Sequence, residues 1–504
     1  MPRIRKILVA NRGEIAIRVF RTCRDLGIGT VAVYSDADRA ALHVRMADEA
    51  YRIGPAPSSE SYLVIDAVLD AAARSGADAV HPGYGFLSEN PEFAERCTAR
   101  GFTFIGPPAS AMRAMGDKVA ARKLMQAAGV PMAPGTIDPV DDAEQALAVA
   151  ADIGYPVLIK ATAGGGGKGM RIVHSDEQVA AAFEAAQREA TAAFSNGGLY
   201  VEKYIQESRH VEIQILADHH GSAIHLFERE CSIQRRHQKV IEESPSCVLD
   251  ESLRARMGET ALQATLACGY AGAGTVEFLL DDAQNFFFME MNARLQVEHA
   301  VTEAVTGIDL VAEQIRIAEG LPLRLRQDDL ELRGHAIECR IYAEDPCSSF
   351  LPNPGTLVRH SAPAGPRVRV DSGVEEGVEI PIHYDPMIAK VVTWGPDRDQ
   401  AINTMLRALD EYRISGVQTT IPFCRYVLEH ADFRSGNFST HFVEDRFSAE
   451  ALGQASEHES MTAALASVLT RKQPANGFTP ATDGVRDDGW SPWAANRRRT
   501  RMRG

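Results

Sequence analysis

Residues 286–303, which read FFFMEMNARLQVEHAVTE, constrain the fold of this chain more than any other stretch. The first seven of these residues alternate in character, which is typical of a β-strand. An extended chain places Glu290 and Asn292 on one side with Phe286 and Phe288, and the intervening apolar side chains on the other. The pattern therefore predicts a strand that ends in a carboxylate and an amide.

The polar residues that follow carry the same pattern further. If the chain stays extended, Arg294, Gln296 and Glu298 project on the side of the carboxylate, and Leu295 and Val297 turn away. A fork of guanidinium donors would then lie beside an acid. This arrangement favours a chemical role for the stretch over a packing role.

A second apolar run, AGTVEFLL, precedes a turn at Asp281–Asn285 and contains Glu277. Glu277 and Glu290 are equally distant from a turn centred between residues 283 and 284, so an antiparallel hairpin would place them opposite each other. Two facing carboxylates destabilise a sheet unless a positive charge lies between them. Mg²⁺ or Mn²⁺ is the natural candidate, with Asn292 as a further oxygen ligand. The alternative is two surface glutamates on the rim of a hairpin.

Composition excludes several classes of function. The chain has 504 residues and a formal net charge of −15, which suggests about three domains and argues against bulk binding of nucleic acid. None of the eight cysteines has CxxC spacing, and no apolar signal segment or membrane-spanning run is present. We expect a cytoplasmic protein that binds neither nucleic acid nor membrane.

The N-terminal region predicts a βαβ unit, with strands at residues 7–10 and 30–34 and a helix between them. Its first turn reads NRGE and lacks the glycine pattern of dinucleotide-binding folds. The later loop HPGYGFLSEN follows a strand, and its Tyr84 and Glu89 are candidate ligand contacts, although an ordinary glycine-rich connection is an equal alternative. A helix over residues 111–128 carries Lys118, which by itself indicates only a solvated charge.

A loop of four consecutive glycines joins two predicted strands, at residues 157–160 and 170–173. It is not a P-loop, because Gly169 follows Lys168 where Ser or Thr is required. We interpret it as a hairpin flap whose backbone N–H groups and lysine can close over phosphates. Further on, residues 235–239 gather Arg235, His237 and Lys239, for which a solvated loop is the simpler explanation.

The chain becomes rich in predicted strands beyond Glu319. In HAIECRIYAEDP, Arg340 shares a face with Glu338 and Tyr342, which indicates a placed and paired arginine. Strands near residues 356–359, 368–370 and 387–394 and a helix over 398–412 complete a third domain. After Thr470 the composition predicts poor order.

Eight motifs occur in order along the chain: NRGEIA, HPGYGFLSEN, MGDKVAA, GGGGKGM, EKYI, RRHQKV, EMNARLQVEH and ECRIYAEDP. Together they resemble the biotin carboxylase family over residues 1–445. The resemblance implies a multidomain α/β and α+β fold with a Rossmann-like N-terminal domain, an ATP-grasp central domain with a mobile glycine-flap lid, and a β-rich C-terminal domain. The implied domains are residues 1–114, 115–330 with a lid at 132–204, and 331–447, followed by a partly disordered extension at 448–504.

The resemblance also assigns roles to single residues. The ATP-binding positions are Lys118, Lys160, Gly166, Gly167, Lys168, Glu202, Lys203, Tyr204, Ile205, His210, Gln234 and His237. The metal ligands are Glu277, Glu290 and Asn292, for two ions. The bicarbonate-binding positions are Lys239, Arg294, Gln296 and Val297. Glu298 matches the general base, Arg340 matches the residue that stabilises the biotin enolate, and Tyr84 joins Arg340 in the biotin pocket. Arg294, Glu298, Arg340 and Lys239 are thus the expected catalytic set.

The implied reaction uses ATP and bicarbonate to carboxylate biotin through carboxyphosphate, as the first half-reaction of an acetyl-CoA or other acyl-CoA carboxylase. No Met-Lys-Met biotin-attachment motif follows residue 445, so we expect a separate subunit that works with a biotin carboxyl carrier protein and a carboxyltransferase. A homodimer is also expected. Two alternatives remain: another acylphosphate-forming ATP-grasp ligase, and a homologue that binds nucleotide without turnover.

Overall fold

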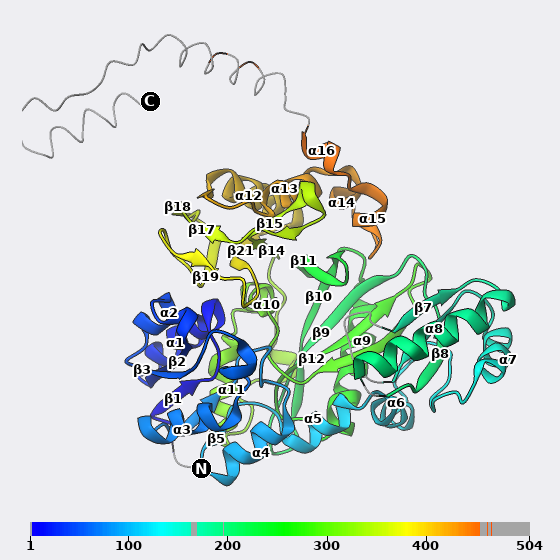
Figure 1. The fold of residues 1–504 in the computed structure, drawn as a ribbon, viewed down its shortest axis with the longest axis horizontal. Helices are drawn as coiled ribbons and strands as arrows, with labels where there is room; N and C mark the ends of the chain where they lie inside the picture. Colours follow the sequence, from blue (N-terminus) through cyan, green and yellow to red (C-terminus); the bar gives the residue numbers. More distant parts are fainter. Residues whose placement is uncertain (1–2, 163–168, 195, 454–460, 462–464, 466–504) are drawn as a thin grey trace, which may run out of the picture. The chain divides into compact units, whose positions relative to one another are not determined.

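The computed structural model describes residues 3–162, 169–194 and 196–453, together with residues 461 and 465 (Figure 1). The chain divides into two units after Leu452, and the first unit holds nearly all of the described residues. Among the residues described, no helix is both long and apolar enough to cross a membrane. The poor order predicted after Thr470 concerns residues outside the described part.

The N-terminal part is a five-stranded parallel sheet in the order β3-β2-β1-β4-β5. Its strands are β1 (Lys6–Val9), β2 (Gly29–Ser35), β3 (Glu49–Gly54), β4 (Ala79–His81) and β5 (Thr103–Phe104). The predicted βαβ unit is confirmed, because α1 (Gly13–Asp25) connects β1 to its parallel neighbour β2.

Helices cover both faces of this sheet because successive strand residues point to opposite sides. Ile7 and Val9 belong to an apolar cluster with α1 and α11 (Leu310–Ala318), whereas Leu8 belongs to a cluster with α3 (Ile65–Ser75) and α4 (Pro91–Ala99). The short helix α2 (Leu42–Met46) follows β2. The doubly covered parallel sheet agrees with the predicted Rossmann-like domain.

An antiparallel sheet of eight strands runs through the central and C-terminal parts in the order β13-β12-β9-β10-β11-β14-β21-β19. In chain order these strands are β9 (Arg209–Ala217), β10 (Ala223–Arg235), β11 (Gln238–Ser244), β12 (Gly272–Leu280), β13 (Phe286–Asn292), β14 (His335–Tyr342), β19 (Val368–Ser372) and β21 (Met387–Gly395). The pairing of β11 with β14 joins the two parts into one sheet.

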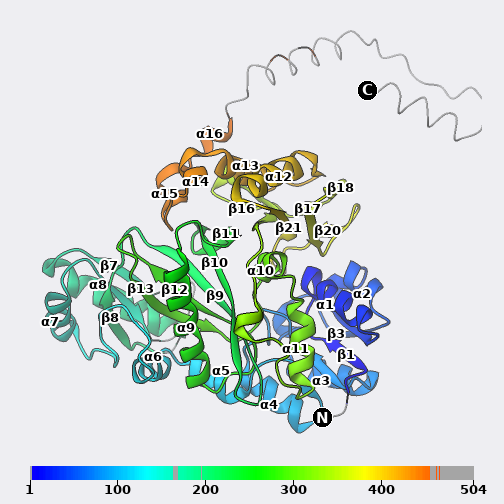
Figure 2. The ribbon, with the colours of Figure 1, turned by 180° about the vertical axis from the view of Figure 1, so that it is seen from behind.

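Helices pack along this sheet, as the two ribbon views show (Figures 1 and 2). α9 (Glu251–Ala267) packs on β9 and β10, and α10 (His299–Thr306) contacts β14. The C-terminal helices are α12 (Arg398–Glu411), α13 (Ile421–Glu429), α14 (Ala431–Ser435), α15 (Phe442–Arg446) and α16 (Ala449–Gly453). Ile402 and Phe423 of α12 and α13 share an apolar core with Ile337 and Val391 of the sheet.

Short strands complete the C-terminal part: β15 (Glu344–Asp345), β16 (Leu351–Pro352), β17 (Gly355–Thr356), β18 (Arg359–Ser361), β20 (Glu379–Ile380) and β22 (Arg413–Ser415). A separate three-stranded sheet, β7-β6-β8, lies at the right of Figure 1 with two helices on it. Its elements are α7 (Ala143–Ile153), β6 (Val157–Ala161), β7 (Met170–Val173), α8 (Asp176–Phe194) and β8 (Leu199–Lys203). The hairpin predicted around the glycine loop is confirmed by the antiparallel pairing of β6 with β7.

The single helix predicted over residues 111–128 is wrong. The chain forms α5 (Ala109–Gly116) and α6 (Lys118–Ala127), with a break at Asp117. The Asp117 carboxylate accepts hydrogen bonds from the backbone N–H groups of Val119 and Ala120, at 2.9 and 3.0 Å. This cap starts a new helix, so Lys118 becomes its first residue.

The predicted facing of Glu277 and Glu290 is confirmed, but the symmetric register behind it is wrong. Phe278 pairs with Phe288 and Glu277 pairs with Glu290, so β13 carries one extra residue, Met289, as a β-bulge. The bulge reverses the side-chain alternation. Phe286 and Phe288 are buried in the core, whereas Glu290 lies on the opposite side with Phe287.

The extended run expected after Asn292 does not form. β13 ends at Asn292, residues 293–298 are irregular, and α10 starts at His299. In place of an alternating strand, this segment turns Leu295 into an apolar core and Gln296 and Glu298 into a pocket.

Candidate active site

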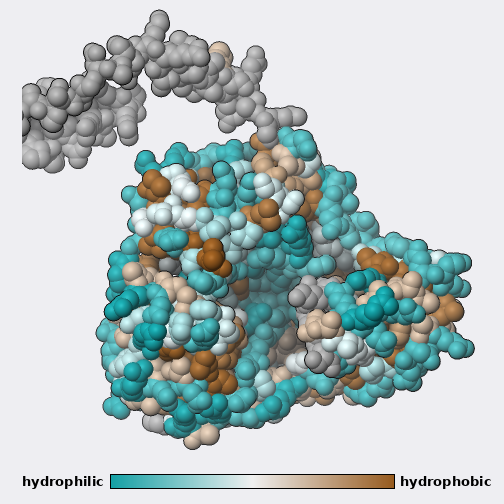
Figure 3. All heavy atoms as spheres, in the orientation of Figure 1, coloured by the Kyte–Doolittle hydropathy of each residue, from teal (hydrophilic) through white to brown (hydrophobic). Residues whose placement is uncertain are grey.

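Three adjoining pockets meet in the unit that ends at Leu452. The first pocket, of about 300 Å³, lies between α6 and the strands β6, β8 and β13. The second, of about 370 Å³, shares Lys118, Lys160 and Glu290 with the first. The third, of about 530 Å³, shares Arg294 and Arg340 with the second. The face seen in Figure 3 is deeply hollowed, and hydrophilic residues line the hollow.

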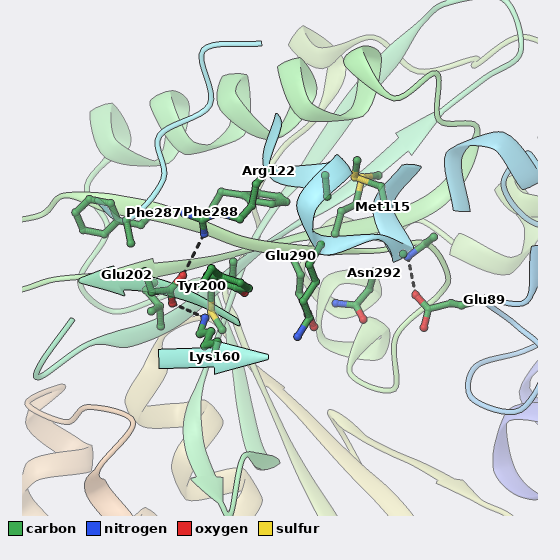
Figure 4. A pocket seen from close by; sticks show the side chains of 18 of the residues that line it. Glu89, Met115, Arg122, Lys160, Tyr200, Glu202, Phe287, Phe288, Glu290 and Asn292 are labelled. Carbon is green, nitrogen blue, oxygen red and sulfur yellow. Dashed lines mark hydrogen bonds and ion pairs between the residues drawn. The ribbon is translucent and has the colours of Figure 1, made fainter. Parts of the chain in front are cut away.

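The first pocket combines an apolar wall with a cluster of charges (Figure 4). Met115 and Phe287 contribute to the wall. Lys160 forms an ion pair with Glu202, which also accepts a hydrogen bond of 3.1 Å from Arg122. An apolar wall beside cations suits a planar base that carries phosphates.

Lys118 reaches the first pocket from the start of α6. Desolvation and the nearby positive charge of Lys160 lower the pKa of the Lys118 ammonium. Two cations held this close together favour a polyanion between them.

The segment 202–205 contributes less to the pocket than predicted. Lys203 Nζ donates to the carbonyls of Gly154 and Tyr155, both at 2.9 Å, and the Tyr204 hydroxyl lies 3.1 Å from His441 Nε2. Of the four predicted residues, only Glu202 lines any of the three pockets, and it lines the first. Gly166, Gly167 and Lys168 of the glycine flap fall outside the described residues.

Lys239 is the centre of the second pocket. Its ammonium lies 2.5 Å from Glu212, 2.9 Å from Glu277 and 2.7 Å from Glu298. Lys239 reaches this position because Arg236 and His237, with φ of 47° and 64°, form a two-residue turn between β10 and β11. The charge run that could have been a solvated loop is therefore a tight hairpin.

Arg229, which the sequence analysis missed, lies fully buried beneath the carboxylates. Its guanidinium donates to Glu212 at 2.6 Å and to Gln296 at 2.8 Å. Further donations at 2.7 to 3.0 Å reach Gln214, Thr275 and Thr302. The signal available in the sequence was an arginine between two glutamates inside a strand, in ERE.

The surroundings of Glu298 keep it ionised. Burial alone would raise the pKa of this carboxyl group, but Lys239, Arg340 and Arg229 hold it well below its usual value. Its second oxygen accepts a hydrogen bond of 2.9 Å from Arg340. Glu298 thus connects the lysine of the second pocket to the arginine that the second and third pockets share.

Arg340 also pairs with Glu242, at 2.6 Å, a buried carboxylate that the sequence analysis did not select. Burial raises the pKa of Glu242 to about 7 against the opposing effect of Arg340. Glu338, the cross-strand neighbour of Glu242, is also buried, and burial raises its pKa well above the usual value. The predicted paired arginine is therefore present, with partners on two elements.

The predicted metal ligands suit a hard divalent cation. Glu290 makes no hydrogen bond or ion pair with any other described residue, and desolvation and the facing Glu277 raise its pKa. Asn292 is buried beside it, and its Oδ1 accepts a hydrogen bond of 2.9 Å from Arg294. Two facing carboxylates and an amide oxygen form an oxygen donor set of the kind that Mg²⁺ prefers.

A group of possible metal donors that the sequence did not predict contains His210. The ligand atoms of His210, Glu212 and Glu277 lie within 4.8 Å of one another, and His210 Nε2 is 3.2 Å from Glu277. Gln234 Nε2 lies 3.1 Å from the other ring nitrogen of His210. Gln234, His210 and His237 all line the second pocket, so the predicted positions are brought together there.

Arg294 is fixed by a residue from the N-terminal part. Glu89 accepts from Arg294 Nε at 3.0 Å and from the backbone N–H of Ala293 at 2.9 Å. The Gln296 amide donates to Glu277 at 2.8 Å. Arg294, Gln296, Val297 and Lys239 all line the second pocket, as predicted for one small anion.

The third pocket lies between the N-terminal and C-terminal parts. Tyr84 lines it, and its hydroxyl donates to the buried carboxylate of Glu14. Arg340 and Val297 line both this pocket and the second pocket. A ligand in the third pocket would therefore meet Arg340, the hydrogen-bond partner of Glu298, where the two pockets adjoin.

Three family models match successive parts of the chain. "Biotin carboxylase, N-terminal domain" matches residues 3–112, and "Carbamoyl-phosphate synthase L chain, ATP binding domain" matches residues 117–326. "Biotin carboxylase C-terminal domain" matches residues 338–445.

Two relatives match over nearly their whole length. Biotin carboxylase 1 of Bacillus subtilis is 55% identical over 442 residues, which are 88% of this chain and 98% of that protein. The biotin carboxylase of Nostoc sp. is 56% identical over 440 residues, which are 87% of this chain and 98% of that protein.

Solved structures are similar as well. The biotin carboxylase domain dimer of Hydrogenobacter thermophilus 2-oxoglutarate carboxylase, in complex with MgADP, ADP and bicarbonate, is 46% identical with a TM-score of 0.85. That match covers 91% of this chain and 100% of that chain.

Proposed function

The chain belongs to the biotin carboxylase family, and we propose that it uses ATP and bicarbonate to carboxylate biotin carried by a separate protein. The observation that supports this reaction best is the position of Glu298. One of its oxygens contacts Lys239 in the second pocket, and the other contacts Arg340 at the boundary with the third pocket. An acid in that position can serve two substrates that meet there.

The first pocket is assigned to ATP. The adenine would lie against the apolar wall, and Lys118 and Lys160 would meet the phosphates. This placement directs the γ-phosphate towards Glu277 and Glu290, which line the second pocket. A divalent cation held by Glu277, Glu290 and Asn292 would spread the charge of the transferring phosphoryl group.

The second pocket is assigned to bicarbonate. Arg294 presents a planar fork of donors that suits a planar oxyanion, and Gln296 and the backbone of Val297 lie beside it. Glu298 would take the proton of bicarbonate, whose oxygen then attacks the γ-phosphorus while ADP leaves. The product, carboxyphosphate, would break down to CO₂ and phosphate within the pocket, and catalysis would require that water be kept from them there.

The third pocket is assigned to biotin. N1 of biotin would give its proton to the phosphate released from carboxyphosphate and would then bond to the carbon of CO₂. Arg340 would stabilise the negative charge that develops on the ureido oxygen during this step. Tyr84 would form a wall of the pocket. We further propose that the chain forms a homodimer in the cytoplasm and works with a biotin carboxyl carrier protein and a carboxyltransferase, catalysing the first half-reaction of an acetyl-CoA or other acyl-CoA carboxylase.

The Glu298→Gln variant tests the assignment of the base. Gln keeps the size of the side chain but cannot accept the bicarbonate proton, so bicarbonate-dependent ADP release should fall by about 10²- to 10⁴-fold. Binding of ATP, measured by calorimetry, should change little. Unchanged turnover would show that Glu298 is not the base.

Free biotin separates this function from that of other ATP-dependent ligases. We expect biotin to increase ADP release by the wild-type protein only when bicarbonate is present. Binding of ATP with no carboxylation of any biotinyl carrier would instead support a homologue without turnover.

A further inference from the structure

Lys390 of β21 is a fully buried lysine to which neither the motifs nor the proposed reaction assigns a role. Its ammonium donates a hydrogen bond of 2.6 Å to the backbone carbonyl of Val297. It also lies 3.4 Å from Glu14, at the start of α1. Lys390 therefore contacts the irregular segment 293–298 and the N-terminal part at the same time.

Glu14 extends this contact to the third pocket. The carboxylate of Glu14 accepts a hydrogen bond from the hydroxyl of Tyr84. A continuous chain of polar contacts thus runs from the Val297 carbonyl through Lys390 and Glu14 to Tyr84. Its two ends lie in the pockets assigned to bicarbonate and to biotin.

Lys390 lies in a layer of charges on the sheet. Its cross-strand neighbours are Arg340 on β14 and Asp371 on β19. Burial disfavours its charged form, but Glu14, Glu338 and Asp371 more than offset this effect and raise the pKa of Lys390. The side chain is therefore an ammonium that can hold a carbonyl firmly.

Packing alone gives little reason for a lysine at this position. A buried ion pair is often no more stabilising than an apolar pair of similar size, because both charges lose their hydration. The ammonium is, however, the group that contacts the Val297 carbonyl. The segment 293–298 has no regular backbone hydrogen bonding to hold it, which makes such an anchor useful.

We propose that Lys390 is a positioning residue that fixes the bicarbonate-binding segment at Val297 and, through Glu14, aligns it with the Tyr84 wall of the biotin pocket. This inference rests on the proposed function. Lys390 itself lines neither pocket and acts only through the groups it holds.

The test uses the variant K390M, in which a methionine fills the space without donating a hydrogen bond. Bicarbonate-dependent ADP release and thermal unfolding are measured on the full chain. Loss of one charge-assisted hydrogen bond should raise the KM for bicarbonate about tenfold or more, while the KM for ATP stays within about twofold.

A second variant separates the loss of the hydrogen bond from a general loss of stability. K390M leaves Glu14 buried without its cation, whereas the double variant K390M/E14Q removes both charges and keeps an acceptor for Tyr84. The double variant should therefore recover thermal stability relative to K390M. Its KM for bicarbonate should remain raised relative to E14Q alone.

Arg398→Met is the matched control, because Arg398 pairs with the buried Glu243 at 2.7 Å and lines none of the three pockets. It should lose stability without a change in the KM for bicarbonate. The inference is overturned if both K390M and K390M/E14Q keep the wild-type KM for bicarbonate. Absence of bicarbonate-dependent ADP release from the wild-type protein would instead refute the proposed function itself, and the inference with it.

Discussion

Lys239 shows how single residues set the chemistry of the second pocket. Its one positive charge faces Glu212, Glu277 and Glu298, and Arg229 supplies a second positive charge from beneath. Together with Arg340 these cations hold the pKa of Glu298 well below its usual value in spite of its burial. Glu298 is therefore an ionised carboxylate near neutral pH, as a general base for bicarbonate must be.

His81, again a single residue, leads to a prediction about how folding stability depends on pH. It is fully buried at the end of β4, where Nδ1 accepts from the backbone N–H of Gly83 at 3.0 Å and Nε2 lies 3.2 Å from Gln314 Oε1. Burial lowers the pKa of this imidazole to about 4. Below about pH 6.5 the imidazole of His81 binds a proton in the unfolded chain but stays neutral in the folded chain. The free energy of unfolding therefore falls between about pH 6.5 and pH 4.

The His81→Asn variant should reduce this fall by roughly 3 kcal/mol, because asparagine keeps an acceptor for Gly83 and does not titrate. The measurement is the free energy of unfolding in urea from pH 7 to pH 4.5. His219→Asn is the control, since His219 is exposed. An equal slope in wild type and His81→Asn would contradict the prediction.

At the scale of elements, the break between α5 and α6 decides where Lys118 lies. Asp117 caps α6 and makes Lys118 its first residue, beside the first pocket. A continuous helix would place the lysine in the middle of a helix and not at its first residue.

Asp117→Ala should lower the free energy of unfolding by about 1 kcal/mol and raise the KM for ATP severalfold, because the cap and the position of Lys118 are lost together. Asp250→Ala is the control. Asp250 caps α9 through the backbone N–H of Leu253 at 2.7 Å and does not line the pockets. Asp250→Ala should therefore reduce stability without changing the KM. A KM for ATP equal in both variants would disprove the role of the α6 cap.

At the scale of the whole molecule, the third pocket exists because the N-terminal and C-terminal parts contact each other. Tyr384, in the loop between β20 and β21, contacts Ser35 Oγ and the Ala56 carbonyl, each at 2.5 Å. The guanidinium of Arg12 stacks over its ring at 4.3 Å, and Phe86 meets the ring edge to face. These contacts join the parallel sheet to the C-terminal part at the wall of the pocket.

Tyr384→Ala should lower the free energy of unfolding by about 1 to 2 kcal/mol, because the ring is only partly buried. It should also raise the KM for free biotin, with the KM for ATP unchanged, because the first pocket does not include this loop. Differential scanning calorimetry and steady-state kinetics measure the two effects. Tyr412→Ala removes an aromatic ring from the core of the C-terminal part and is the matched control. It should destabilise the protein without changing the KM for biotin. The same KM for biotin in both variants would show that Tyr384 does not shape the pocket.

The sequence by itself determined which chemistry is possible. Strand and helix periods predicted the βαβ unit, the flap hairpin and the strand that carries Arg340, since these signals lie within a few residues of one another. The repulsion between the facing carboxylates of Glu277 and Glu290 could be recognised for the same reason. The family resemblance was carried by specific motifs.

Only the tertiary structure decided how the strands, helices and buried charged side chains contact one another. The bulge at Met289 shifts the following side chains by one position, and the break at Asp117 and the irregular segment 293–298 each change the direction of the backbone. Local alternation does not reveal such changes. Arg229, Glu242 and Lys390 were missed because their partners lie 15 or more residues away in the chain. A buried charge is recognised by the groups that surround it, and those groups come together only when the sheet of eight strands has formed.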